Sequence, residues 1–328
     1  MRRLLVASLL LAASFLVLAG SWSAMAQAAP ADSAVSPLDR PGRPAVLPNG
    51  RKLNFRCSGK GSPTVILESG YGADSLAWTR TAPRIAQVTR VCAYDRAGYG
   101  FSDMGPLPRD GAAIARDLDR GLSAARIKGP YVLVGHSAGG LYMRLFAARR
   151  RGQVVGLVFV DSPVEHQADR LAVIFGPGAG SLDALVSRTT ACLEAARSPS
   201  SEAANPACVP ATGRAQQRLI TTRPETWLTR QSELSTLFTS TSDQVDKVGD
   251  LLRRIPAIVL TATPDPDGVA AGPNAPGVAV WQAFHSKLAS GFDHGQQRLV
   301  HSSHLMMVER PEVVADAVLE LVGAARAR

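Results

Sequence analysis

A serine and a histidine stand side by side in the stretch YVLVGHSAGGLYMR, residues 131–144. Ser137 lies in a Gly-x-Ser-x-Gly pattern, the spacing of a nucleophile at a sharp turn between a strand and a helix. An apolar run precedes this pattern, and a helical pattern follows from Ala138. A turn this sharp needs small residues at positions 135, 139 and 140, and all three are glycine. We therefore predict that Ser137 is a nucleophile raised above the end of the strand.

A serine hydroxyl becomes nucleophilic when a base takes its proton and an acid orients that base. His136 adjoins the serine on the tight turn and points away from it, so we assign it a packing role against a neighbouring strand. The stretch QRLVHSSHLMMVERPEVV, residues 297–314, offers His301 and His304. His304 follows a predicted strand in a loop that can reach over the sheet, and we prefer it as the base. His301 lies at the strand end, where a structural role is expected.

The acid has two sources, each at the end of a predicted strand. AIVLTATPDPDG, residues 257–268, offers Asp265 and Asp267, and LVFVDSP, residues 157–163, offers Asp161. A Pro-Asp turn would also explain Asp265, and a helix cap would also explain Asp161. We prefer Asp265 as the acid, keep Asp161 as the alternative, and give Asp267 little weight.

Acyl transfer also needs hydrogen-bond donors for the oxyanion. The turn around the serine presents the backbone N–H of Ala138. The stretch VILESGYG, residues 65–72, provides a second donor, because Gly70 and Gly72 allow a close backbone approach. This leaves the N–H of Tyr71 as the predicted donor.

The elements that must position these residues alternate along the chain, which predicts α/β units around a largely parallel sheet. The alternation breaks over residues 163–254, where a helical and more polar pattern predicts a cap inserted into a core of residues 48–162 and 255–328. The predicted strands are Lys52–Cys57, Thr64–Glu68, Val91–Tyr94, Tyr131–Val134, Val155–Val160, Ala257–Ala262 and Gln297–Val300. The predicted helices are Trp78–Val88, Ala112–Ala125, Ala138–Arg150 and Pro311–Ala325.

The first residues have the pattern of a secretory signal peptide. Arg2 and Arg3 precede an apolar run, and Ala24-Met25-Ala26 fits the cleavage pattern, which predicts a signal peptide over residues 1–26. Residues 27–47, rich in Ala, Pro and Ser, are predicted to form a flexible leader. We expect a protein exported to the periplasm or secreted, with an uncleaved N-terminal anchor as the alternative.

Composition and charge describe a folded globular chain, with 46% hydrophobic and 19% charged residues. The net charge is +9, and removal of Arg2 and Arg3 leaves +7. The basic residues are scattered, so no nucleic-acid partner is expected. No Cys-x-x-Cys or Cys/His cluster predicts a metal site. In an exported chain the four cysteines predict disulfides, and spacing favours Cys57–Cys92 and Cys192–Cys208.

Four stretches of the chain together resemble the α/β-hydrolase superfamily. LVGHSAGG resembles the nucleophile turn of that family, and LESGYG resembles its oxyanion loop. VCAYDRAGYGFSD is similar to the stretch after the fourth strand, and SSHLMMVERPEVV is similar to the terminal histidine loop. The resemblance covers the predicted core and leaves the cap unmatched. Two departures are Ser69, where many members have histidine, and a Pro-rich acid loop, which leaves the acid open. The resemblance implies an eight-stranded, mostly parallel sheet. Its second and fourth strands would be neighbours and would carry Cys57 and Cys92. The Cys192–Cys208 disulfide would cross-link two segments of the cap.

Serine at the turn argues against the dehalogenase and epoxide-hydrolase relatives, which use aspartate there. The resemblance implies two-step acyl transfer without metal or organic cofactor, and we predict a carboxylic ester as the small-molecule substrate. Tyr71, Trp78 and residues 305–307 suggest a partly apolar acyl pocket. Amidase or peptidase, lactonase, thioesterase and cofactor-free peroxidase activities are alternatives, as is a non-catalytic binding protein. Oligomeric state and acyl specificity are not predicted.

Overall fold

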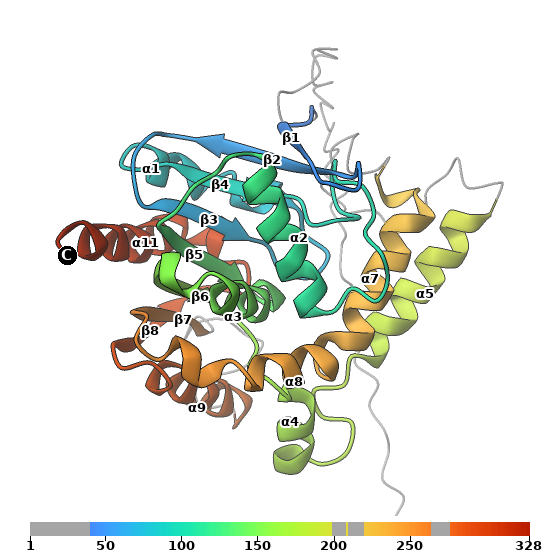
Figure 1. Ribbon diagram of the computed structural model, residues 1–328. Helices are drawn as coiled ribbons and strands as arrows, with labels where there is room; N and C mark the ends of the chain where they lie inside the picture. Colours follow the sequence, from blue (N-terminus) through green and yellow to red (C-terminus); the bar gives the residue numbers. More distant parts are fainter. Residues whose placement is uncertain (1–39, 199–207, 209–219, 264–275) are drawn as a thin grey trace, which may run out of the picture. The chain divides into compact units, whose positions relative to one another are not determined.

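The central sheet of the computed structural model has eight strands in the order β1-β2-β4-β3-β5-β6-β7-β8 (Figure 1). The structure describes residues 40–198, 208, 220–263 and 276–328. The β1–β2 and β2–β4 pairs are antiparallel and the remaining pairs are parallel, which confirms the predicted fold class. The strands are β1 (Arg43–Val46), β2 (Lys52–Ser58), β3 (Thr64–Glu68), β4 (Val91–Tyr94), β5 (Tyr131–His136), β6 (Val154–Val160), β7 (Ala257–Thr263) and β8 (Gly295–His301).

Alternating side chains of each central strand enter two different cores, as the twofold period of a strand requires. In β5, Leu133 packs in one core, whereas Val132 and Val134 pack in the other. The first core is covered by α2 (Gly111–Ala124), α3 (Ala138–Arg149) and α9 (Pro276–Ser290), and the second by α1 (Ala82–Ala86) and α11 (Pro311–Arg326). Helices on both faces explain why the central strands are apolar throughout.

Some elements differ from the sequence predictions. Arg43–Val46, placed in the flexible leader, forms β1 at the sheet edge, where the missing N–H of proline is tolerated. The helix predicted over Trp78–Val88 is instead the 3₁₀-helix η2 (Ser75–Trp78) followed by α1. Helix α9 was not predicted, because the Pro- and Gly-rich run before it favours turns.

The described residues between β6 and β7 form helices, which we call the β6–β7 insertion. These are α4 (Gln167–Phe175), α5 (Asp183–Arg197), α7 (Pro224–Leu237), α8 (Ser240–Asp246) and the 3₁₀-helix η4 (Gly249–Leu252). A small core of Cys192, Leu193, Cys208 and Trp227 joins α5 to α7. The division of the chain into a core domain and a cap stays a prediction.

Both predicted disulfides are present. The β2–β4 register places Cys57 opposite Cys92, and these two residues are bonded. Cys192 of α5 is bonded to Cys208. Two disulfides are compatible with an oxidising compartment.

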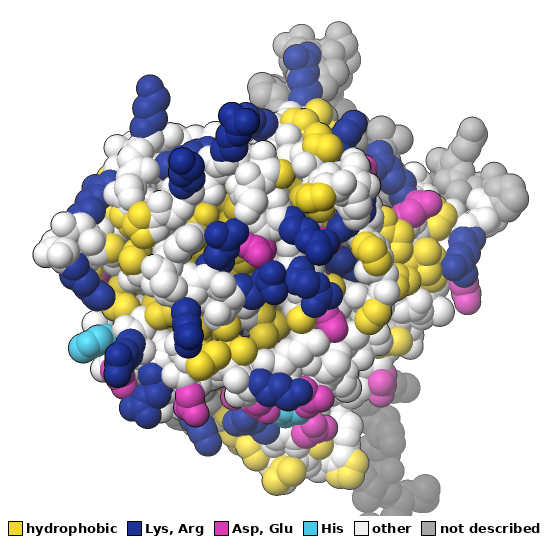
Figure 2. Space-filling model, in the orientation of Figure 1, with side chains coloured by type: hydrophobic (Ala, Val, Ile, Leu, Met, Phe, Trp, Pro, Cys, Tyr) yellow, Lys and Arg dark blue, Asp and Glu magenta, His cyan; other side chains and the backbone are white. Residues whose placement is uncertain are grey.

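Two further features concern the distribution of surface charge and the length of the helices. Lys and Arg side chains are dispersed among neutral and acidic groups over the face shown in Figure 2. Among the described residues, no helix is both long and apolar enough to cross a membrane.

Candidate active site

Ser137 lies between the end of β5 and the start of α3, in the turn predicted from the sequence. Its backbone has φ 49° and ψ −133°, a left-handed conformation that a residue with a side chain adopts only under constraint. The constraint is close packing: a Cβ on Gly135 would lie 2.6 Å from Cα of Gly140. We call residues 135–140 the Ser137 turn. Its geometry presents the serine at the carboxyl end of the sheet and Ala138 at the helix N-terminus.

Asp161 follows the neighbouring strand at the same edge of the sheet. Because His136 pairs with Val160, Ser137 and Asp161 leave β5 and β6 at equivalent positions. Oδ2 of Asp161 accepts a hydrogen bond from Nδ1 of His304 at 2.7 Å. Asp161 is therefore the acid in contact with the predicted base.

Two further donors hold the other carboxylate oxygen of Asp161. Oδ1 accepts hydrogen bonds from Nε1 of Trp281, at 2.7 Å, and from the backbone N–H of Ala262, at 2.9 Å. Burial acts to raise the pKa of Asp161, but the bonds from His304, Trp281 and Ala262 outweigh it and hold the pKa below its ordinary value. The carboxylate is therefore ionised at neutral pH and can orient a histidine.

His304 lies in the loop after β8, and 51% of its side chain is exposed, against 6% for Asp161. His136 contacts it directly: the two ring centroids are 4.7 Å apart, and Nε2 of His136 is 2.9 Å from the carbonyl oxygen of His304. Burial, and next the proximity of His304, lower the pKa of His136 to about 3. His136 is therefore neutral, and because a carbonyl only accepts, its Nε2–H is the donor. His136 is also buried against the loop after the neighbouring strand β3, since a Cβ on Gly70 would lie 2.8 Å from its Nδ1, so the contact with the His304 loop adds to the expected packing role.

The other candidates from the sequence have different positions. Asp265 and Asp267 lie in residues 264–275, outside the described residues. His301 is the last residue of β8, and its Nδ1 is 3.2 Å from Oγ1 of Thr263, a contact within the sheet. Trp281 was missed by sequence reasoning, since its helix was not predicted.

Residues 69–72, which we call the Gly70 loop, follow β3 and contact the Ser137 turn. A Cβ on Gly70 would lie 2.9 Å from Cβ of Ser137, so only glycine allows this approach. The hydroxyl of Tyr71 is 2.8 Å from Oγ1 of Thr189 in α5. The loop that carries the predicted Tyr71 donor is therefore beside the serine and in contact with the β6–β7 insertion.

A buried ionic cluster lies against the Gly70 loop. Arg96 pairs with Glu68 at 2.7 Å and with Glu233 of α7 at 3.2 Å, and each of these side chains is at most 1% exposed. Burial raises the pKa of Glu68 to about 7, although Arg96 and the hydroxyl of Tyr94 oppose that rise. No sequence pattern marks Glu233, which is one of several polar residues in a polar segment.

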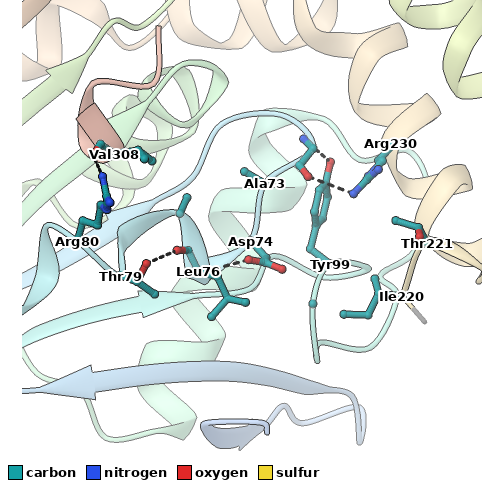
Figure 3. A pocket seen from close by; sticks show the side chains of 13 residues that line it. Ala73, Asp74, Leu76, Thr79, Arg80, Tyr99, Ile220, Thr221, Arg230 and Val308 are labelled. Carbon is teal, nitrogen blue, oxygen red and sulfur yellow. Dashed lines mark hydrogen bonds between the residues drawn. The ribbon is translucent and has the colours of Figure 1, made fainter. Parts of the chain in front are cut away.

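A pocket of about 390 Å³ borders the Gly70 loop (Figure 3). Gly72, Asp74, Tyr99, Thr221 and Arg230 contribute to its wall, with Val308 at one end. Burial, and next the neighbouring Asp95, raise the pKa of Asp74 to about 6. The pocket therefore offers both apolar and charged groups beside the loop.

The described residues contain no group of three or more His, Cys, Asp or Glu side chains arranged to hold a metal ion.

Residues 65–317 match the alpha/beta hydrolase family, so the chain belongs to that family. The matched segment contains Ser137, Asp161 and His304.

Individual relatives share parts of the chain or its fold. The chain is 36% identical over 117 residues to the probable transporter efuK of Hormonema carpetanum, covering 34% of this chain and 17% of that protein. It is 33% identical over 115 residues to an AB hydrolase superfamily protein of Gibberella zeae, covering 34% and 36%. The chain thus spans less than half of the length of each of these two relatives.

Solved structures resemble the chain over most of its length. An enol-lactonase from Burkholderia xenovorans LB400 has a TM-score of 0.57 at 19% identity, covering 86% of this chain and 100% of that one. A thermophilic esterase from Thermogutta terrifontis has a TM-score of 0.56 at 20% identity, covering 85% and 96%. At these identities the likeness shows the fold alone.

Proposed function

We propose that this protein is a serine hydrolase that cleaves carboxylic esters with Ser137, His304 and Asp161. The observation that carries the proposal is the 2.7 Å hydrogen bond from Nδ1 of His304 to Asp161, which follows β6 at the position equivalent to that of the strained Ser137 after β5. Asp161 replaces Asp265, the acid preferred from the sequence, because it accepts the hydrogen bond that orients the base.

In the first step His304 acts as the base. Asp161 keeps the ring proton on Nδ1, so Nε2 carries the lone pair and takes the proton from Oγ of Ser137. Oγ attacks the ester carbonyl, and the backbone N–H groups of Tyr71 and Ala138 donate to the oxyanion. As the intermediate collapses, the C–O bond to the alcohol breaks, and the proton on Nε2 passes to the leaving alkoxide.

In the second step water replaces the alcohol. Nε2 of His304 takes a proton from water while the water oxygen attacks the acyl carbonyl. The bond between the acyl carbon and Oγ of Ser137 then breaks, and Nε2 returns the proton to the serine. The products are a carboxylic acid and the free enzyme.

Because ester hydrolysis needs the least activation of the leaving group, we take an oxygen ester as the first substrate bond to test; an esterase and an enol-lactonase share the fold. The same residues could cleave an amide, a thioester or a lactone, so the bond is decided by experiment. A panel of chromogenic esters of graded acyl length tests the assignment, with matched amides, thioesters and lactones beside it.

Labelling by a fluorophosphonate separates catalysis from simple binding. We expect label on the wild type and none on Ser137→Ala, together with loss of ester turnover in that variant. A wild type that takes no label and turns over no ester would overturn the proposal in favour of a binding protein. Label together with hydrogen-peroxide-dependent oxidation, and no hydrolysis, would assign the peroxidase alternative instead.

We also propose that the chain is exported and cleaved after Ala26. The sequence of residues 1–26 supports this, and the two disulfides are compatible with it. Mass spectrometry of the protein from cell fractions tests it: we expect a mature N-terminus at Gln27 outside the cytoplasm, and an intact N-terminus would contradict cleavage.

A further inference from the structure

Two guanidinium groups hold the carbonyl oxygens of the Gly70 loop. Nη1 of Arg96 donates to the carbonyl of Ser69 at 2.6 Å, and Nη2 donates to the carbonyl of Gly70 at 2.9 Å. Nη2 of Arg230, in α7, donates to the carbonyl of Gly72 at 3.1 Å (Figure 3). Three of the four carbonyls in this loop therefore point to arginines.

The direction of the Gly70 carbonyl fixes the direction of the predicted oxyanion donor. In a trans peptide the C=O and the N–H that follows it point in opposite directions. The carbonyl of Gly70 is bound to Arg96, so the N–H of Tyr71 points away from Arg96. Because Gly70 packs against Ser137, this N–H belongs to the part of the loop that borders the nucleophile. The carbonyl of Gly70 also accepts a longer hydrogen bond from the backbone N–H of Ala73 at 3.3 Å, so loss of Arg96 would leave this peptide held by that turn bond alone.

Arg96 is itself held from the β6–β7 insertion. Glu233 of α7 binds the guanidinium through both carboxylate oxygens, at 3.2 and 3.3 Å, and also accepts a hydrogen bond from the hydroxyl of Tyr99 at 2.9 Å. Glu68 binds the guanidinium from the sheet side at 2.7 Å. A buried charge with partners on both sides is confined to one position, since loss of either partner leaves an uncompensated charge.

We propose that Arg96, clamped by Glu233, is a positioning residue that aims the Tyr71 N–H at the oxyanion, so that the β6–β7 insertion sets the rate of acyl transfer. The proposal rests on the proposed function. It makes α7 part of the apparatus that stabilises the transition state, in addition to any effect on which substrate binds.

The test compares Arg96→Lys and Glu233→Gln with Arg109→Lys. Arg109 is the matched control: it is 2% exposed, its guanidinium binds Asp117 at 2.9 Å and the carbonyl of Pro106, and its backbone N–H donates to Ser232 of α7. None of these partners lies in the Gly70 loop. Lysine carries a compact point charge in place of the planar fork, so it cannot hold two successive carbonyls in the same way.

The readouts are kcat, KM and the inhibition constant of a boronic acid, whose adduct with Ser137 imitates the tetrahedral intermediate. Loss of one oxyanion donor typically costs about 10²- to 10³-fold in kcat, so a misaligned donor in Arg96→Lys should cost about 10- to 100-fold, with KM little changed. Glu233→Gln should show a smaller loss in the same direction. The inhibition constant of the boronic acid should rise in parallel with the loss in kcat/KM.

Arg109→Lys should lower the melting temperature but leave kcat and boronic-acid affinity unchanged. Equal losses of kcat in Arg96→Lys and Arg109→Lys at similar melting temperatures would reduce Arg96 to a structural role. If Arg96→Lys does not fold, Glu233→Gln still tests the proposal, because this variant keeps the arginine. Unchanged kcat and unchanged boronic-acid affinity in Glu233→Gln would overturn the proposal that Glu233 holds Arg96 in position. Failure of the proposed function would appear separately, as an unlabelled wild type or an active Ser137→Ala.

Discussion

Replacing Asp161 by Asn tests the acid assignment most directly. Asparagine keeps the shape of the side chain, and its amide oxygen can still accept from Trp281 and Ala262. Its amide nitrogen then faces Nδ1 of His304, where the carboxylate accepted a hydrogen bond at 2.7 Å. A nitrogen that donates requires a lone pair on Nδ1, so the ring proton moves to Nε2. In that tautomer His304 cannot take the proton of Ser137.

The magnitude follows from the loss of general-base catalysis and of imidazolium stabilisation. In serine proteases, replacement of the triad aspartate by asparagine lowers kcat about 10⁴-fold. The side chain of Asp161 is only 6% exposed, so water cannot readily replace it as the partner of His304. We therefore expect Asp161→Asn to lower kcat by about 10³- to 10⁴-fold, which corresponds to an increase of about 4 to 5.5 kcal/mol in the activation barrier.

The assay measures kcat and KM on a chromogenic ester, with the pre-steady-state burst separating acylation from deacylation. Acylation should be slowed with KM little changed, because the substrate does not contact Asp161 in the proposed mechanism. Asp265→Asn is the control, and we expect activity close to the wild type. A large loss in Asp265→Asn together with a nearly active Asp161→Asn would refute the reasoning.

Other changes test the surroundings of the site and the fold. Trp281→Phe removes a donor to the Asp161 carboxylate, so the free energy of unfolding should fall by about 1.5–3 kcal/mol at pH 7. Because folding lowers the pKa of Asp161, the ionised carboxylate stabilises the fold above its unfolded pKa, and this contribution is lost as pH falls through the folded pKa. In urea titrations the difference in unfolding free energy between the wild type and Trp281→Phe should therefore shrink in acid. A difference that stays constant with pH would argue against a charge-assisted bond. The pKa of Glu68 is instead raised to about 7, so its protonated form is the stabilised one, and the wild type should lose about 3 kcal/mol relative to Glu68→Gln as pH rises from 4 to 8. Parallel pH profiles of the two proteins would show that Glu68 titrates normally. Replacing Cys192 and Cys208 together by Ser removes a cross-link between residues 16 apart and should lower the free energy of unfolding by about 3 kcal/mol, and an unchanged denaturation midpoint would contradict a constraint on the unfolded chain of that size.

Local sterics explain why parts of the site were accessible from the sequence. A serine between closely spaced glycines, after an apolar strand and before a helix, has few structural solutions, and the Ser137 turn adopts the expected one. His304 follows the last strand, and its position was inferred from order along the chain. The alternation of strands and helices was predicted from local periodicity, and cysteine spacing favoured both disulfide pairs. The eight-stranded sheet and the neighbouring positions of its second and fourth strands were implied by the resemblance to the family.

Tertiary structure decided what depends on contacts between strand ends and helices. Asp161 and Asp265 each follow a parallel strand, and composition does not separate them; among the described residues, Asp161 is in contact with His304, Trp281 and the N–H of Ala262. The pairing of Arg96 with Glu233 spans 137 residues, and no local pattern marks it. The sequence alone determined the type of turn and the nucleophile candidate. The oriented acid and the clamp on the Gly70 loop emerge only when distant segments meet, since hydrogen bonds depend on distance and angle in space.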